Sequence, residues 1–295
     1  MSKKITGGVL GAALLIMGPQ AQADISWTFG GNSVSSTVGN TKSQTSGGVT
    51  ATAQAWSNTD NGKTSGSGAS GPLGSNSLTT SASYTLQTAY LNVYSGGLGV
   101  KNLDASSSSN YGDRNDGSSP EHSIDNNQRY DSVLFSFNSA IDLNSVTIGW
   151  SQTDSDISIL AYTGTGSCVG AGTCSADMTG KTYAQLASYG WSLIGQYGNL
   201  ATNVARSVNS GNVASSYWLI GAANPLVGGT TDGTSDYVKL LALSGDKVTP
   251  PCTPGTPGCG GGGGQVPEPG TLLLMGAGLF GLTRINARRA DRSTV

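Results

Sequence analysis

The fold class of this chain follows from the stretch Ser132-Val133-Leu134-Phe135-Ser136-Phe137. Its large apolar residues, Val133, Phe135 and Phe137, recur at every second position, which places them on one face of a β-strand. The same alternation continues in 146–150, through Val146, Ile148 and Trp150, and in 157–161, through Ile157, Ile159 and Ala161. We expect further strands at 25–29, 49–56, 217–221 and 237–243.

Two other segments complete the predicted fold. We expect 138–144 to connect the first two strands, and 84–93 suits a strand or a helix equally. Tyr183, Leu186 and Ala187 share one face of a short helix that Gly190 is placed to end. The sequence therefore predicts a mostly β fold, an antiparallel β-sandwich of jelly-roll type, with a flexible Gly/Pro linker and a C-terminal hydrophobic helix.

The charge of the chain excludes one class of function. Residues 24–265 hold fifteen acidic and nine basic side chains, a net charge of −6, and the basic ones form no cluster. Phosphate contacts need concentrated Lys and Arg, so we expect no nucleic-acid binding.

The N-terminus has the features of a signal peptide. Lys3 and Lys4 precede the apolar stretch 9–17, and Ala21-Gln22-Ala23 matches a small-residue cleavage site. We expect residues 1–23 to be removed by signal peptidase after passage through the Sec translocon, so that the exported chain begins at Asp24.

The C-terminus has the features of a second targeting signal. Val266-Pro267-Glu268-Pro269 is followed by the apolar run 272–282 and by four arginines, the first of them Arg284. The run is shorter than the ~20 residues of an ordinary membrane span and suits a temporary anchor. The region 266–292 resembles a PEP-CTERM sorting signal. This resemblance implies a Gram-negative bacterium, processing by exosortase, a transient stay in the inner membrane, and delivery to the cell surface or the extracellular matrix.

The segment 250–265 is a boundary between the sorting signal and a β-rich domain at 24–249. Its Pro and Gly residues cannot build a core, which makes it a flexible linker. The four cysteines of an exported chain favour disulfides over a metal site. Three pairings exist, and we expect neighbours to pair: Cys168 with Cys174, and Cys252 with Cys259.

The middle of the chain carries another resemblance. The stretches 119–126, 131–137, 148–150 and 154–164 resemble a family of exosortase-dependent surface proteins. That resemblance implies a location and no catalytic residues.

The residues that could support catalysis are few. His122 is the one histidine of the chain, and we interpret it as a loop residue that bonds a neighbour such as Glu121 or Asp125 rather than as part of a triad. Glu121 could also form an acid pair for glycoside cleavage with one of four aspartates. We favour turn and edge roles for these four, which are Asp125, Asp131, Asp154 and Asp156. Asp154 and Asp156 share one face of a strand and repel each other unless they are solvated or bridged.

Calcium is the one cofactor that the sequence suggests. Asp113 and Asp116 lie beside a glycine turn, and Asp125 with Asp131 forms a second oxygen-rich group. Calcium takes about six to eight oxygen ligands, although neither group has the spacing of an EF-hand.

These observations predict a noncatalytic, exported surface or matrix protein. The alternative is a module that binds the carbohydrate of an exopolysaccharide through exposed tryptophans and calcium, and an extracellular glycoside hydrolase is the third hypothesis. The tryptophans available for such a platform are Trp27, Trp56, Trp150, Trp191 and Trp218, although alternating runs favour core packing for several of them.

Overall fold

The computed structural model describes residues 24–59, 84–102, 120, 122–127, 129–164 and 176–248. The chain divides into two compact units, Met1–Thr249 and Pro250–Val295, and every element below belongs to the first. Several predicted features lie outside the described residues: the signal peptide with Ala21 and Ala23, Asp113, Asp116, Glu121, the four cysteines, the linker and the sorting tail.

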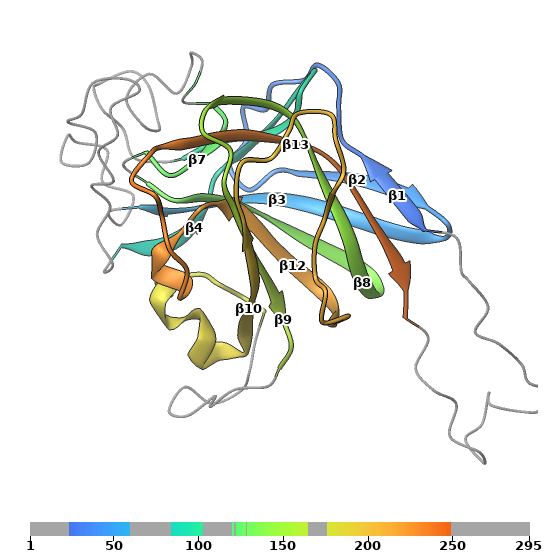
Figure 1. The fold of residues 1–295 in the computed structure, drawn as a ribbon. Coiled ribbons are helices and arrows are strands. Elements are labelled where there is room, and N and C mark those ends of the chain that lie inside the picture. Colours follow the sequence, from blue (N-terminus) through green and yellow to red (C-terminus); the bar gives the residue numbers. More distant parts are fainter. Residues whose placement is uncertain are drawn as a thin grey trace, which may run out of the picture. The chain divides into compact units, whose positions relative to one another are not determined.

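The described residues form one large antiparallel sheet (Figure 1). Its thirteen strands in this part of the chain are β1 (Ile25–Thr28), β2 (Thr41–Ser46), β3 (Val49–Thr59), β4 (Thr85–Thr88), β5 (Tyr90–Tyr94), β6 (Gly97–Lys101), β7 (Ile124–Asp125), β8 (Asp131–Thr153), β9 (Ile157–Tyr162), β10 (Trp191–Tyr197), β11 (Arg206–Ser207), β12 (Ala214–Ala222) and β13 (Asp236–Lys247). The main path runs β10-β9-β12-β8-β13-β6-β5. The expected β-rich, antiparallel class is confirmed.

The long strand β8 joins the two halves of the sheet. Its first part, up to Phe137, pairs with β3 and β12, and its later part, from Ile141, pairs with β13 along most of its length. The halves face each other across a shared core, in a sandwich-like arrangement. We expected two separate sheets, whereas the hydrogen-bonded ladder continues from one half to the other through β8.

The predicted connection at 138–144 is wrong, because these residues continue β8. Ile141 and Leu143 are fully buried and keep the alternation of Val133, Phe135 and Phe137. The register then shifts between Leu143 and Ser145, after which Val146 and Ile148 point inward. A bulge of this kind reverses the face to which the following side chains point. The two predicted strands are therefore one strand, in which odd-numbered residues face the core before the bulge and even-numbered residues face it afterwards.

The inner core lies between the two halves of the sheet. It includes the predicted inward residues of β8 and β9, except Trp150, together with Trp27 and Trp218. The ring centroids of Trp27 and Phe137 lie 4.9 Å apart, edge to face. A side chain at Gly97 would overlap the carbonyl oxygen of Leu240, so glycine permits the close approach of β6 to β13.

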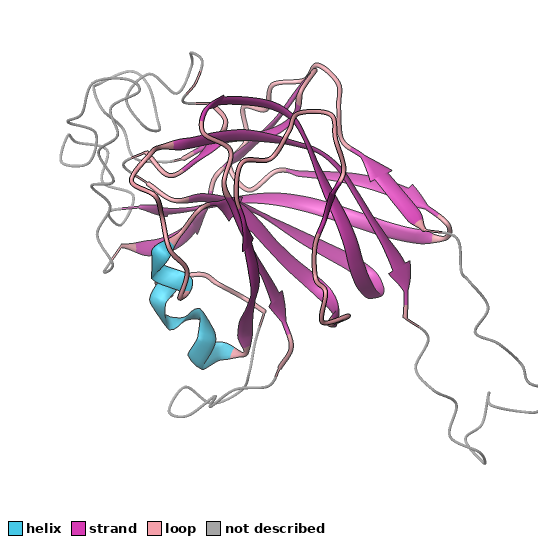
Figure 2. Ribbon diagram, in the orientation of Figure 1, coloured by secondary structure: helices cyan, strands magenta, loops and turns pink. Residues whose placement is uncertain are grey.

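A second cluster of buried residues covers the outer face of β3, β8, β9, β10 and β12. The 3-10 helices η1 (Tyr183–Tyr189) and η2 (Pro225–Val227) lie against this face (Figure 2). Tyr183 and Leu186 are buried there, and Gly190, with φ of 97°, ends η1 as expected. Ala187 is exposed, because a 3-10 helix buries every third residue and not the wider face of an α-helix. Burial on both faces explains the nearly continuous apolar runs of β9 and β12.

The remaining predicted strands are present as β1, β3, β12 and β13, and the ambiguous 84–93 contains β4 and β5. The sequence missed β2, β6 and β10 and the two-residue strands β7 and β11. β2 is built of Thr, Lys, Ser and Gln and has no buried residue, so no hydrophobic alternation marks it. Among the described residues, no helix is long and apolar enough to cross a membrane.

Candidate functional site

Three aspartates meet where β9 and β13 begin. One carboxylate oxygen from each of Asp154, Asp156 and Asp236 lies within 4.8 Å of the others. Asp154 pairs with Asp236 through an isolated bridge, and Asp156 directly precedes β9. We expected Asp154 and Asp156 at a solvent-facing edge. They are instead half-buried around Asp236, which is 1% exposed.

Asp236 is held by directed hydrogen bonds. Its Oδ1 accepts from the backbone N–H of Asp156 at 2.7 Å, and its Oδ2 accepts from Nδ2 of Asn126 at 2.6 Å. Oδ1 of Asn126 accepts in turn from the backbone N–H of Asp236 at 2.8 Å. Burial, and then the charges of Asp156 and Asp154, raise the pKa of Asp236 to about 8.

A fourth aspartate adjoins this group from an exposed loop. The side chains of Asp154 and Asp232 interact electrostatically. Burial and this contact raise the pKa of Asp154, whereas the N–H of Thr234 and the same contact lower the pKa of Asp232. Two neighbouring carboxyl groups whose pKa values move in opposite directions titrate as a pair rather than independently.

A polar cavity of about 280 Å³ lies beside these aspartates. Oε1 of Gln196 accepts from the backbone N–H of Thr230 at 2.5 Å and so ties the loop to β10. The lining residues are Asp156, Gln196, Tyr197, Gly198, Ala223, Thr230, Thr231 and Asp232. Carboxylate, amide and hydroxyl groups around one tyrosine suit a polyhydroxylated ligand, and the three clustered aspartates could hold a divalent cation.

The calcium residues predicted from sequence are placed differently. In the described part of the chain, the acidic group contains neither Asp125 nor Asp131. Both are buried, and Oδ1 of Asp125 accepts from the backbone N–H of Asn127 at 3.0 Å. Sequence reasoning paired Asp125 with Asp131 because they are neighbours in the chain. It missed Asp236, about eighty residues from Asp154, which only the pairing of strands brings near. A calcium site at the predicted residues stays a prediction.

A second buried ionisable residue, Lys239, lies on β13 among aromatic rings. Its Nζ is 3.7 Å from the ring centroid of Trp150 and 4.9 Å from that of Tyr94. Burial lowers the pKa of Lys239 to about 8, against the opposing effect of Asp125. The register shifts between Ile148 and Trp150, which carries Trp150 out of the inner core to Lys239.

His122 stacks on Tyr94, with ring centroids 4.5 Å apart. Burial, and then the charge of Lys239, lower the pKa of His122 to about 4, so its ring is neutral near pH 7. Within the described residues no hydrogen bond reaches Nδ1 of His122. Glu121, one of the two partners predicted for this histidine, lies outside those residues.

Most of the tryptophans predicted to form a sugar-binding platform are buried. Four of them, Trp27, Trp56, Trp191 and Trp218, are core residues no more than 4% exposed. The fifth, Trp150, is half-buried and carries Lys239 on its ring. Core packing therefore accounts for all of the tryptophans except Trp150.

Comparison with known proteins characterises the C-terminus. A family model described as the PEP-CTERM protein-sorting motif matches residues 265–290, as the sequence predicted. No curated protein and no solved structure matches the chain. The motif indicates exosortase-dependent sorting of an exported protein to the cell envelope or surface.

Proposed function

We propose that this chain, which carries an exosortase-dependent sorting motif, is a noncatalytic protein of the cell surface or extracellular matrix of a Gram-negative bacterium. The sorting motif at 265–290 carries the proposal. It follows a β-rich unit of long, mutually paired strands, the kind of rigid antiparallel structure that suits an exposed surface protein.

Two observations support a noncatalytic role. The one histidine of the chain, His122, is stacked on Tyr94 with a lowered pKa, which makes it a poor general base near pH 7. The acidic residues around Asp236 are engaged by backbone and amide donors that hold the fold together.

The route to the surface has three steps in this proposal. The Sec translocon exports the chain, signal peptidase cleaves after Ala23, and exosortase processes the segment at Pro267-Glu268-Pro269. The apolar run that follows holds the chain in the inner membrane until processing.

The intact mass of the surface-released protein, compared between strains with and without exosortase, tests this route. We expect a mass that begins at Asp24 and ends near the Pro-Glu-Pro segment in the wild-type strain, and an unprocessed C-terminus in the mutant. Identical full-length masses in both strains would contradict the proposal.

A second candidate function is binding of exopolysaccharide in the polar cavity, with the acidic group as a cation site. The lining by Asp156, Gln196 and Asp232 favours it, because sugar hydroxyls bind such groups. A glycan array tests this candidate: binding that Asp232→Asn weakens, without turnover, would support it. Hydrolysis abolished by Glu121→Gln would support the glycosidase hypothesis instead.

A further inference from the structure

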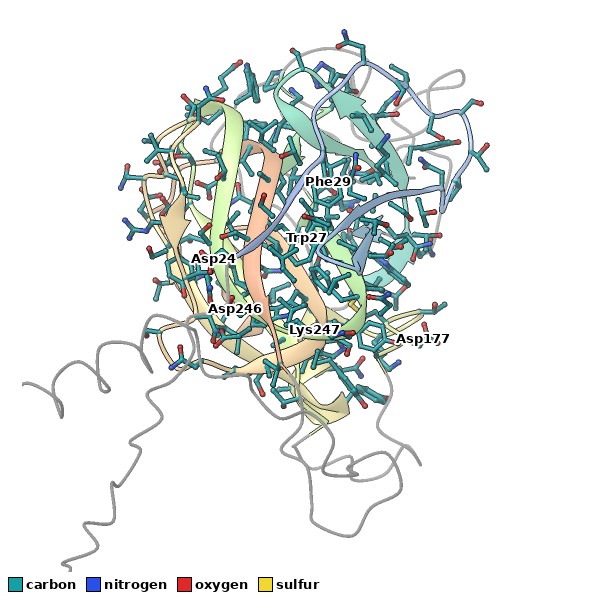
Figure 3. The ribbon with its side chains drawn as sticks, turned by 90° about the vertical axis from the view of Figure 1, so that its right-hand side faces the viewer. Asp24, Trp27, Phe29, Asp177, Asp246 and Lys247 are labelled. Atoms are coloured by element: carbon teal, nitrogen blue, oxygen red, sulfur yellow. The ribbon has the colours of Figure 1, made fainter. Side chains whose placement is uncertain are left out.

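One corner of the domain gathers three carboxylates around two asparagines. Nδ2 of Asn144 donates to Oδ1 of Asp24 at 2.9 Å and to Oδ2 of Asp246 at 3.0 Å. Nδ2 of Asn209 donates to Oδ1 of Asp142 at 2.7 Å. Figure 3 shows Asp24 and Asp246 at adjacent strand ends. Asn144 is the residue at which the register of β8 shifts, and that bulge directs its side chain to this corner.

Continued by one residue beyond Ile25, the strand register sets Asp24 opposite Asp246. β1 and β13 are antiparallel, with Ile25 opposite Gly245, so Asp24 follows opposite Asp246. Residues directly opposite in such a pair have Cα atoms about 4.5–5.5 Å apart. A carboxylate side chain on Asp246 can therefore reach the nitrogen of its cross-strand neighbour.

The corner holds more negative than positive charge. Burial, and then the charge of Asp246, raise the pKa of Asp142. The two donors, Asn144 and Asn209, are neutral. The nearest cation along the chain is the exposed Lys247. β2 also packs against β1, and its one charged residue, Lys42, lies about 16 Å along the chain from the Gly47 turn that touches Ile25.

One carboxylate oxygen of Asp246 can accept a hydrogen bond from a further donor. Its Oδ2 accepts from Asn144, while Oδ1 is buried and has no hydrogen-bond partner among the described residues. A buried carboxylate oxygen is stabilised by a charged N–H donor more than by a neutral one.

We propose that the α-ammonium group created at Asp24 by removal of the signal peptide pairs with Asp246, so that export processing completes an ion pair in the folded domain. This inference rests on the proposed cleavage after Ala23. Hydrolysis of the Ala23–Asp24 peptide bond consumes one water, leaves a carboxylate on Ala23, and turns a neutral peptide nitrogen into a cation at the corner. The unprocessed chain lacks this charge.

The pairing has a defined pH dependence. A nearby carboxylate raises the pKa of an amine, and an unperturbed α-amino group titrates at about 7.7–8.0. The folded pKa is then the higher one. The added stability is fully present below the unfolded pKa and is lost as pH rises through the folded value.

The experiment measures the pKa of the α-amine by NMR after ¹³C-dimethylation, which keeps the group titratable. It uses the chain that begins at Asp24 and a chain that retains Ala21-Gln22-Ala23 as an N-terminal extension. We expect a pKa about 0.5–1 unit above the ordinary value in the first and an ordinary value in the second. Asp246→Asn should lower the first value, and Asp177→Asn, a matched change of an aspartate outside the corner, should leave it unchanged.

An amine pKa in Asp246→Asn equal to that of the unchanged chain that begins at Asp24 would overturn the proposal. The extended chain carries its amine on Ala21, away from the corner and from the side chain of Asp24, so it does not isolate the contact. If Asp246→Asn folds poorly, the chain that begins at Asp24, unfolded in urea, supplies the reference, and an amine pKa no higher in the folded than in the unfolded chain would overturn the proposal. N-terminal sequencing of the exported protein separates this inference from its premise. A different first residue would contradict the cleavage site, whereas the chain made to begin at Asp24 still tests the contact.

Discussion

Asp236 and Lys239 lie on the same strand, β13, and are 1% and 4% exposed, yet the fold accommodates their charges by different means. Directed hydrogen bonds from Asn126 and Asp156 hold the carboxylate. Two aromatic rings hold the ammonium group. Burial moves the pKa of both to about 8, from opposite sides.

The comparison shows which of the two charges the structure depends on. Removing the carboxyl of Asp236 leaves buried donors without acceptors, because hydrogen bonds have direction and fixed partners. The ring faces around Lys239 accept a neutral side chain of similar shape, and the one opposing charge that acts on its pKa is that of Asp125. The carboxyl group should therefore matter more than the ammonium charge.

The largest expected effect comes from Asp236→Ala. The change leaves Nδ2 of Asn126 and the N–H of Asp156 short of an acceptor in a buried place, so we expect a loss of about 2–4 kcal/mol in the free energy of unfolding. Urea denaturation measures it. Asp232→Asn, at an exposed loop position, is the control and should change stability by less than about 0.5 kcal/mol. A loss of stability from Asp236→Ala no larger than that of the control would contradict the view that the fold depends on the carboxyl of Asp236 more than on the charge of Lys239.

The second prediction concerns pH, in the presence of a chelator. The folded pKa of Asp236, about 8, lies above the ordinary 3.8, so its proton stabilises the fold at low pH and this contribution is lost as pH rises toward 8. The destabilisation caused by Asp236→Asn should be largest near pH 4 and should shrink toward pH 8. Urea titrations at several pH values measure it. A destabilisation that grows with pH would show that the carboxylate form is the one the fold prefers.

A cation effect is the third prediction. Extracellular calcium modules bind with Kd of about 0.1–1 mM, and calcium at ten times Kd would add about 1.4 kcal/mol, or roughly 3–5 °C in Tm. Melting curves with calcium and with chelator measure the shift. Loss of the shift in Asp154→Asn/Asp236→Asn assigns it to the acidic group, whereas loss in Asp113→Asn or Asp125→Asn assigns it to the residues predicted from sequence. Overlapping curves would exclude both.

The smallest effect is expected from Lys239→Met. Methionine keeps an unbranched stem against Trp150 and Tyr94 and removes a desolvated charge, so stability should stay within about 1 kcal/mol of the wild type. The folded pKa of Lys239 is lowered from 10.5 to about 8, so the charged lysine destabilises the wild type most below pH 8. The free energy of unfolding of the variant, relative to the wild type, should therefore be highest below pH 8 and should fall as pH rises to 10.5. Lys239→Ala, which removes the aliphatic part of the side chain as well as the charge, is the control and should lower stability more than Lys239→Met. A loss of several kcal/mol from Lys239→Met would show that the charge itself is needed.

The strands whose apolar residues alternate were predictable, because one buried face imposes a period of two on the sequence. Val133, Phe135, Ile157 and Ile159 are all buried as expected. The joining of two predicted strands into β8 was not, because polar residues between 137 and 146 resemble a turn until Ile141 and Leu143 are seen to face the core.

The candidate site was only half predictable. Asp154 and Asp156 stand out in the sequence as neighbours that must be solvated or bridged. Asn126, Asp232 and Asp236 join them through strand pairing and hydrogen bonds that span tens of residues. No local pattern in one sequence signals such a distant partner.

The sequence alone determined the destination of this protein and its β-rich class. Both depend on local order: a sorting motif is recognised as a linear segment, and an alternating strand buries one face wherever it pairs. Tertiary structure alone decided that β8 joins the two halves of the sheet, that Asp236 completes an acidic group, and that Asp24 and Asp246 accept hydrogen bonds from the same asparagine. These features depend on strand register, which sets residues far apart in the chain opposite one another, and register is fixed only when the whole sheet has formed.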